Sequence, residues 1–245
     1  MYSIILAAGI SSRLRPLTNE LPKCLLQIGE QTILERMISS LKKNNIEEII
    51  LVTGFCEEKI QLFVRVNFST LNIHCVSNPQ FATTSNSYSL WYALDYVFSL
   101  KNNIRKENSL LLFDADIVFD EQILQSIIQE QNENAVVVVQ QFQLTEEEVK
   151  VQTENNTIVH IGKDVLPAEA SGESIGIEKF SSDVARRLYE ILSARKYKDK
   201  FYEESFQILI DEGIKFHATN VTDFRCIEID TAEDYAVAQK IFAQK

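Results

Sequence analysis

Glycine, proline and cysteine are all scarce in this sequence of 245 residues, and the shortages exclude several classes of protein. With 7 glycines and 4 prolines, the chain is neither collagen-like nor a low-complexity disordered segment. The 4 cysteines include no Cys-x-x-Cys pair and the 3 histidines are scattered, so a zinc site is not expected. We expect reduced, mostly buried thiols in a cytoplasmic protein.

Long apolar runs and an excess of positive charge are absent as well. No run approaches the ~20 apolar residues that a membrane helix needs, so membrane insertion is not expected. The N-terminal stretch MYSIILAAG lacks the basic region and cleavage site of a signal peptide, and it indicates a buried strand. Because the formal net charge is -11, the chain would repel a nucleic-acid backbone, and no nucleic-acid partner is expected. A single nucleotide needs only a local positive site and is compatible with this charge.

Apolar runs of strand length alternate with helical periods along the first 140 residues. Strands are expected at residues 2–7, 48–53, 72–77, 109–113 and 135–140, and helices at 32–43, 57–66, 87–100 and 121–131. Thr32 and Glu35 form a capping-box pattern at the first of these helices. The alternation predicts an α/β fold with a doubly wound, mostly parallel sheet.

After residue 140 the pattern changes to shorter strands, with Asn155 and Asn156 as a hairpin turn. Strands are expected at residues 149–153, 157–162, 173–179, 215–219 and 226–229, and helices at 181–194, 202–212 and 231–242. Because no linker rich in glycine, proline or serine separates the two patterns, we interpret residues 1–245 as a single domain. Its later part carries a small β-rich layer.

The segment after the first strand has the composition of a phosphate-binding loop. Small residues allow a ligand to approach the backbone closely, serine hydroxyls and N–H groups can hold phosphate oxygens, and a guanidinium and an ammonium supply charge. The segment contains neither the GK[ST] of a Walker A loop nor a GxGxxG fingerprint. The candidate ligand-binding residues are Leu6, Ala7, Ala8, Gly9, Ser11, Ser12, Arg13 and Lys23.

Two acidic residues, Asp114 and Asp116, follow directly on the apolar strand at residues 109–113. Carboxylates at the end of a buried strand are costly unless something holds them, and a divalent cation such as Mg²⁺ is a natural partner. A solvated helix cap is the alternative interpretation. Asp230, before the last helix, poses the same choice between a ligand and a helix cap.

A polar run from Asn78 to Ser89 leads into the helix expected at residues 87–100. Amide and hydroxyl groups at this position could contact the edge of a nucleotide base, and the candidates are Ser85, Asn86 and Ser87. The alternative is an ordinary N-terminal helix cap.

The N-terminal segment, LAAGISSRLRPLT followed by Pro22 and Lys23, resembles the signature of the sugar-phosphate nucleotidyltransferase superfamily, LAAGxGxRLxPLT followed by PK. It departs from that signature at Ser11, where the family usually has glycine. The resemblance implies a Rossmann-like, GT-A-like nucleotidyltransferase fold. It also implies that Arg13 binds the triphosphate and that Lys23 acts on the phosphates around the reacting centre, so both are candidate catalytic residues.

The same resemblance implies that Asp116 and Asp230 hold one Mg²⁺, with Asp114 behind them as a nucleotide-binding residue. The composition of residues 78–91 looks most like the cytidylyltransferases that act on phosphocholine or 2-aminoethylphosphonate. Candidates for the acceptor site are Lys150 or Lys163 for the phosphate, Glu173 and Glu203 for a cationic group, and Tyr88 and Tyr202 for an aromatic wall.

We therefore expect an enzyme that joins CMP from CTP to a small phosphorylated or phosphonate amino-alcohol and releases pyrophosphate. Residues 1–140 would form the nucleotide-binding core, residues 141–225 would shape the acceptor site, and residues 226–245 would add a final strand and helix. A sugar-1-phosphate nucleotidylyltransferase that uses another NTP is the main alternative. A nucleotide-binding regulatory module without turnover is a second alternative, and the oligomeric state, including a homodimer, stays open.

Overall fold

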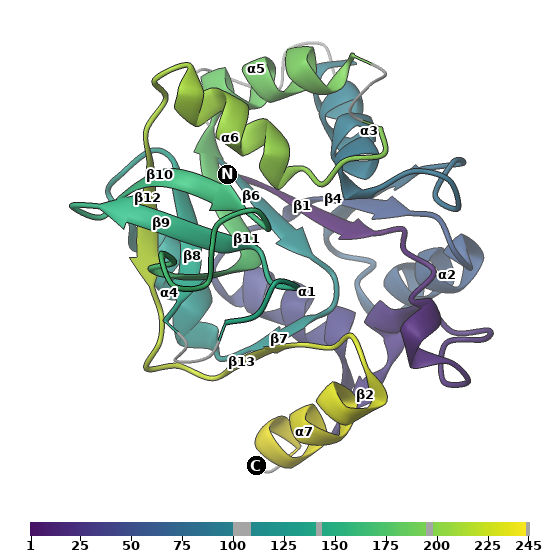
Figure 1. Ribbon diagram of the computed structural model, residues 1–245. Coiled ribbons are helices and arrows are strands. Elements are labelled where there is room, and N and C mark those ends of the chain that lie inside the picture. The colour runs from purple at the N-terminus through teal and green to yellow at the C-terminus, as the bar shows by residue number, and fades with distance from the viewer. Residues whose placement is uncertain (100–108, 141–143, 195–197, 244–245) are drawn as a thin grey trace.

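A nine-stranded sheet with helices on both faces forms the centre of the computed structural model, which describes residues 1–99, 109–140, 144–194 and 198–243 (Figure 1). In spatial order its strands are β5 (Asn72–Ser77), β4 (Glu48–Thr53), β1 (Tyr2–Ala7), β6 (Ser109–Asp114), β11 (Gly172–Ser181), β8 (Ala135–Val139), β12 (Phe216–Asn220), β10 (Thr157–Gly162) and β9 (Lys150–Glu154). The predicted α/β fold is confirmed, and the expected strands lie where the sequence placed them, with small shifts at their ends.

The sheet is mixed rather than mostly parallel. Strands β5, β4, β1 and β6 pair in parallel, as predicted for the first part of the chain. β11 then pairs antiparallel with both β6 and β8, and β9 and β10 form an antiparallel hairpin through Asn155 and Asn156. Both asparagines have positive φ (49° and 65°), which a two-residue hairpin turn requires. The β-rich part of the chain therefore extends the main sheet.

Alternation of side chains along each strand divides the core between the two faces of the sheet. In β1, Ile4 and Leu6 pack on one face, and Ile5 and Ala7 pack on the other. The first face is covered by α3 (Asn86–Ser99), α5 (Ser182–Leu192) and α6 (Glu203–Asp211), and the second by α1 (Ile33–Lys43), α2 (Glu57–Asn67) and α4 (Glu121–Gln129) (Figure 1). The central strands are apolar on both faces for this reason.

Two short antiparallel ribbons lie outside the main sheet. They are β2 (Gln27–Ile28) with β3 (Gln31–Thr32), and β7 (Ile117–Phe119) with β13 (Cys226–Glu228). The sequence analysis did not predict β2, β3 or β7. The expected capping box of α1, from Thr32 and Glu35, is present.

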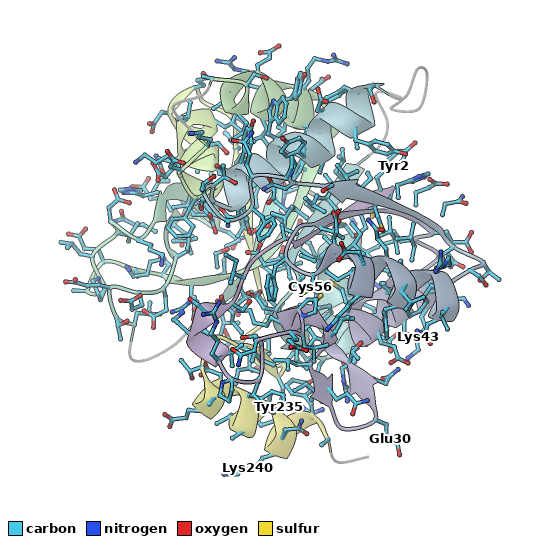
Figure 2. All side chains as sticks on the ribbon, turned by 90° about the vertical axis from the view of Figure 1, so that its right-hand side faces the viewer. Tyr2, Glu30, Lys43, Cys56, Tyr235 and Lys240 are labelled. Atoms are coloured by element: carbon cyan, nitrogen blue, oxygen red, sulfur yellow. The ribbon has the colours of Figure 1, made fainter. Side chains whose placement is uncertain are left out.

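The last helix, α7 (Ala232–Phe242), is capped by Thr231 and Asp234, again as the pattern suggests. It is attached by Tyr235, whose hydroxyl donates to the carbonyl of Gln27 at 2.8 Å; Figure 2 labels this tyrosine on α7. None of the helices in the described part of the chain is long and apolar enough to cross a membrane. The expected end of the third helix at residue 100, and residues 141–143 beside the expected boundary at 140, lie outside the described residues.

Backbone contacts bring the ends of β1 and β4 together. The N–H of Phe55 donates to the carbonyl of Ala8 at 3.1 Å. At Gly54, a Cβ atom would lie 2.7 Å from Cβ of Phe81 and 2.8 Å from the Ala8 oxygen. Glycine at this position thus allows the loop after β1 to lie directly against β4.

Replacing Gly54 with alanine is therefore expected to lower the free energy of unfolding by about 1–3 kcal/mol, because backbone or ring atoms must move to make room. Urea denaturation measures the change. Gly9→Ala is the matched control, because nothing lies within 4 Å of its added Cβ. An equal loss in both variants would contradict the close approach at Gly54.

Candidate active site

The loop after β1 turns sharply at Ser11, which has the left-handed conformation (φ 53°, ψ 49°) and precedes the 3-10 turn Ser12–Leu14. Glycine adopts this conformation more easily than serine, which explains why the resembling signature has glycine here. The turn is held by Thr18, whose hydroxyl donates to the Ser11 carbonyl at 2.8 Å. This hydrogen bond stabilises the left-handed turn at a residue that is not glycine.

This loop forms one wall of a cavity of about 270 Å³ at the carboxyl ends of β1 and β6. Most of the residues that the sequence analysis assigned to a nucleotide or metal line it. They are Leu6, Ala7, Ala8, Gly9, Ser11, Arg13, Lys23, Ser85, Asn86, Asp114, Asp116 and Asp230. Ser12 is exposed outside this lining and Ser87 is buried in α3, so neither candidate lies at the cavity wall.

Lys23 lies between the two candidate metal ligands. Its Nζ is 2.7 Å from Oδ2 of Asp116 and 2.8 Å from Oδ1 of Asp230, while Arg13 contacts the other oxygen of Asp230 at 2.6 Å. Burial alone would lower the pKa of Lys23, but the two carboxylates hold that pKa above its usual value. Burial would likewise raise the pKa of Asp230, yet Lys23 and Arg13 hold it below its usual value. Lys23 and Asp230 are therefore both charged at neutral pH.

Three carboxylates could hold a divalent cation here. Asp116, Glu228 and Asp230 each offer one oxygen, and these oxygens lie within 4.8 Å of one another. Oδ1 of Asp116 is buried and has no hydrogen-bond partner among the described residues. An orphaned carboxylate oxygen beside two other carboxylates fits a hard cation such as Mg²⁺, which binds oxygen ligands.

The pairing of β7 with β13 creates this cluster. Glu228 lies opposite Ile117, and the N–H of Ile229 donates to the carbonyl of Asp116 at 3.0 Å. The sequence analysis did not identify Glu228. Its position two residues before Asp230 was the available signal, because residues i and i+2 of an extended segment share a face.

The segment that was expected to contact the base is held by buried polar contacts. Asn78 is buried, and its side chain donates to the hydroxyl of Ser89 at 3.1 Å and accepts from the N–H of Gln80 at 3.0 Å. Ser85 donates its N–H to the carbonyl of Lys198 at 2.9 Å. Of the three candidates, Ser85 and Asn86 therefore reach the cavity from a fixed backbone.

A second cavity, of about 300 Å³, adjoins the first. The two share part of their lining, so they lie side by side. The shared residues are Arg13, Asn86, Asp114, Phe201, Glu228 and Asp230. Beyond them, Lys163, Glu173 and Glu203, which the sequence analysis named as acceptor candidates, line the second cavity.

Glu203 has an unusual environment in the second cavity. The residue is 5% exposed, and its Oε2 has no hydrogen-bond partner among the described residues. Burial raises the pKa of Glu203 to about 7, although its own backbone N–H and the charge of Lys163 oppose the shift. Lys163 itself lies over the ring of Phe201, 4.8 Å from the centroid. Phe201, which lines both cavities, was not identified from the sequence.

Three of the acceptor candidates lie outside the lining of the second cavity. Lys150 is fully buried, and its ammonium donates to the carbonyls of Thr145 (3.1 Å) and Glu148 (2.9 Å). Tyr88 stacks on Trp91 with ring centroids 5.3 Å apart. Tyr202 is fully buried beneath Asp114. Of the two lysines left open by the sequence, only Lys163 lines the cavity.

Comparisons with known proteins agree with this geometry. The MobA-like NTP transferase domain family matches residues 3–196. The CTP:phosphoglutamine cytidylyltransferase of Campylobacter jejuni is 28% identical over 97% of this chain and 98% of its own. The choline-phosphate cytidylyltransferase of Streptococcus pneumoniae is 24% identical over 98% of each chain. The structure of the inositol-1-phosphate CTP transferase from T. maritima has a TM-score of 0.79 and 22% identity, covering 98% of this chain and 95% of that one.

The family match spans well over half of the chain and includes the N-terminal loop, the polar segment at residues 78–89 and the acidic strand end. The expected resemblance to nucleotidyltransferases, and to cytidylyltransferases among them, is confirmed. With its loop and acidic cluster at the carboxyl ends of β1 and β6, this chain belongs to the MobA-like NTP transferase domain family.

Proposed function

We propose that this nucleotidyltransferase is a magnesium-dependent cytidylyltransferase that joins CMP from CTP to a small acceptor carrying a phosphate or phosphonate and a cationic group. One observation carries the proposal: of two adjoining cavities, the first is lined by Arg13 and Lys23 with three acidic side chains, and the second by Lys163 and Glu203. The named relatives use CTP with different acceptors, which supports the nucleotide more strongly than the acceptor.

The reaction is an in-line displacement at phosphorus. An acceptor oxygen attacks the α-phosphorus of CTP and forms a new O–P bond, while the bond to the oxygen bridging the α- and β-phosphorus breaks. Pyrophosphate leaves with that electron pair. The acceptor oxygen is already anionic, so the reaction needs no general base, and the protein acts by positioning and by stabilising charge.

Each cavity has its own task in this reaction. Arg13 and Lys23 would bind the triphosphate and stabilise the leaving pyrophosphate. Asp116, Glu228 and Asp230 would hold Mg²⁺, which supplies charge neutralisation at the phosphate oxygens. Residues 1–140 supply most of this nucleotide-binding part.

The acceptor part comes from residues 141–225 in this proposal. Lys163 would bind the acceptor phosphate, and Glu203 with Glu173 would face its cationic group. A negatively lined cavity with one lysine suits a ligand that has an anionic end and a cationic end. This is the chemistry of phosphorylated and phosphonate amino-alcohols.

The direct test is pyrophosphate release with Mg²⁺ and each of the four NTPs. The acceptors are phosphocholine, phosphoethanolamine, 2-aminoethylphosphonate, phosphoglutamine and glucose-1-phosphate. Turnover is expected with CTP and at least one nitrogen-containing acceptor, and chelation of the metal should abolish it. Turnover with glucose-1-phosphate and another NTP would instead establish a sugar-1-phosphate nucleotidylyltransferase. Nucleotide binding without any turnover would favour the regulatory alternative.

Lys23→Ala is expected to lower kcat by about 10²–10³-fold, because an ammonium that stabilises the leaving charge is lost. Steady-state kinetics measures the effect. Lys43→Ala is the matched control, since Lys43 also pairs with a carboxylate (Glu121, 3.0 Å) but lies on the surface, where Figure 2 labels it. A near-normal kcat in Lys23→Ala would refute the assigned role.

The two lysines that the sequence left open should respond differently to replacement by methionine. Lys163→Met is expected to raise KM for the acceptor by about tenfold or more, because a charge-assisted contact to phosphate is lost. Lys150→Met should leave that KM unchanged and lower the free energy of unfolding by about 1–3 kcal/mol, because the carbonyls of Thr145 and Glu148 lose the donor that the buried ammonium supplies. Steady-state kinetics and thermal unfolding of both variants measure these effects. A raised KM in Lys150→Met together with an unchanged KM in Lys163→Met would instead assign the acceptor phosphate to Lys150.

A further inference from the structure

Tyr202 lies at the junction of the two cavities without lining either. It precedes α6, is fully buried, and packs edge-on against Phe206 with ring centroids 5.5 Å apart. Its neighbours in the chain point the other way, because Phe201 lines both cavities and Glu203 lines the second. The buried side chain of Tyr202 therefore lies behind Phe201 and Glu203, which line the proposed acceptor site.

The hydroxyl of Tyr202 contacts two carboxyl groups. It lies 3.1 Å from Oδ2 of Asp114 and 3.3 Å from each side-chain oxygen of Glu178. A phenol has one proton to donate, so it can serve only one of these groups as a donor. Glu178 also accepts from the hydroxyl of Ser174 at 3.4 Å, so it has a second donor besides Tyr202.

The two carboxyl groups differ in distance and in exposure. Asp114 is the nearer of the two to the hydroxyl of Tyr202. Glu178 is fully buried in β11, whereas Asp114 is partly exposed and faces both cavities. Burial raises the pKa of both groups well above their usual values. Tyr202 therefore joins an acid of the interior to an acid that faces the cavities.

The backbone on the other side of Asp114 is shaped to fit the same carboxylate. Gly176 in β11 has φ +70°, and a Cβ atom there would lie 2.7 Å from Oδ2 of Asp114. This is the oxygen that accepts from Tyr202. The carboxyl group of Asp114 thus lies between the hydroxyl of Tyr202, which donates to it, and the backbone of Gly176, which has no side chain to displace it.

Tyr202 also contacts the nucleotide side through its backbone. Its N–H donates to Oδ1 of Asn86 at 3.1 Å, and Asn86 lines both cavities. This bond fixes the carboxamide of a residue that the proposed function assigns to the base. One residue therefore orients two polar groups at the junction of the cavities.

We propose that Tyr202 is a positioning residue whose hydroxyl, held by Glu178, fixes the Asp114 carboxylate in the orientation that nucleotide binding requires. The inference rests on the proposed function, because it takes the first cavity as the nucleotide site. Asp114 stands two residues before Asp116, so a free rotation would bring it toward a site that already holds three carboxylates. Tyr202 prevents this rotation without contacting the ligand.

Tyr202→Phe removes the hydroxyl and keeps the ring against Phe206. We expect the Kd of CTP, measured by titration calorimetry with Mg²⁺ and no acceptor, to rise about tenfold, as loss of one hydrogen bond to a carboxyl group implies. In turnover assays the KM for CTP should rise in parallel. Tyr96→Phe is the matched control, because it loses one hydroxyl contact (to His74, 2.9 Å) far from the cavities. A purely structural role would lower Tm in both variants and leave both Kd values unchanged, which would overturn the inference.

Glu178→Gln tests whether the contact of Tyr202 with Asp114 is the one that matters. Glutamine keeps a hydrogen-bonding side chain of the same size beside Tyr202, so this variant should bind CTP more tightly than Tyr202→Phe does. Binding as weak as that of Tyr202→Phe would show that Glu178, and not the contact with Asp114, controls CTP binding, and it would overturn the inference. If the unaltered protein bound none of the four NTPs, the proposed function itself would fail, and this inference with it. A failure confined to the variants would leave the proposed function intact.

Discussion

The contact of Lys23 with Asp116 and Asp230 is the interaction around which the candidate site is arranged. Carboxylates from distant parts of the chain meet there because β7 pairs with β13, and without a cation they would repel one another. Within the protein itself, the ammonium group of Lys23 supplies this positive charge. The geometry of the loop after β1, which carries Arg13 and leads to Lys23, thus depends on the C-terminal segment that carries Asp230.

The same contact explains how a chain with a net charge of -11 can accept an anionic nucleotide. The two cations of the loop are already paired with the carboxylates of Asp116 and Asp230. A triphosphate without a metal would therefore meet no excess of positive charge. A divalent cation shifts this balance, because it gives the carboxylates a partner and frees Lys23 to face phosphate oxygens. In the proposed function the metal is therefore needed for binding as well as for turnover.

Sequence periodicity predicted most of the strands and helices. It did not predict the contacts between segments that are distant in the chain. Buried strands such as β1 and β4, and the capping box at Thr32, follow from local pattern. The three residues of β7 are too short for a period, so the pairing that brings Glu228 to the cluster was not foreseen. Spacing also could not show where Lys150 and Tyr202 point. Lys150, on β9, and Tyr202, just before α6, are both buried, and their polar atoms bond to other groups of the protein.

The boundary between the two cavities coincides with the boundary between the two halves of the sheet. β6 ends the parallel part and carries Asp114, whereas β11 begins the mixed part and carries Gly176 and Glu178. The loop after β1 belongs wholly to the first half, and Lys163 and Glu203 follow strands or begin helices of the second. In the proposed function, side chains around the acceptor can therefore differ without disturbing the loop that binds the triphosphate. The named relatives, whose acceptors differ, agree with this division. Tyr202 lies at that boundary, so on the same proposal a change at positions 201 or 203 must preserve its contact with Asp114.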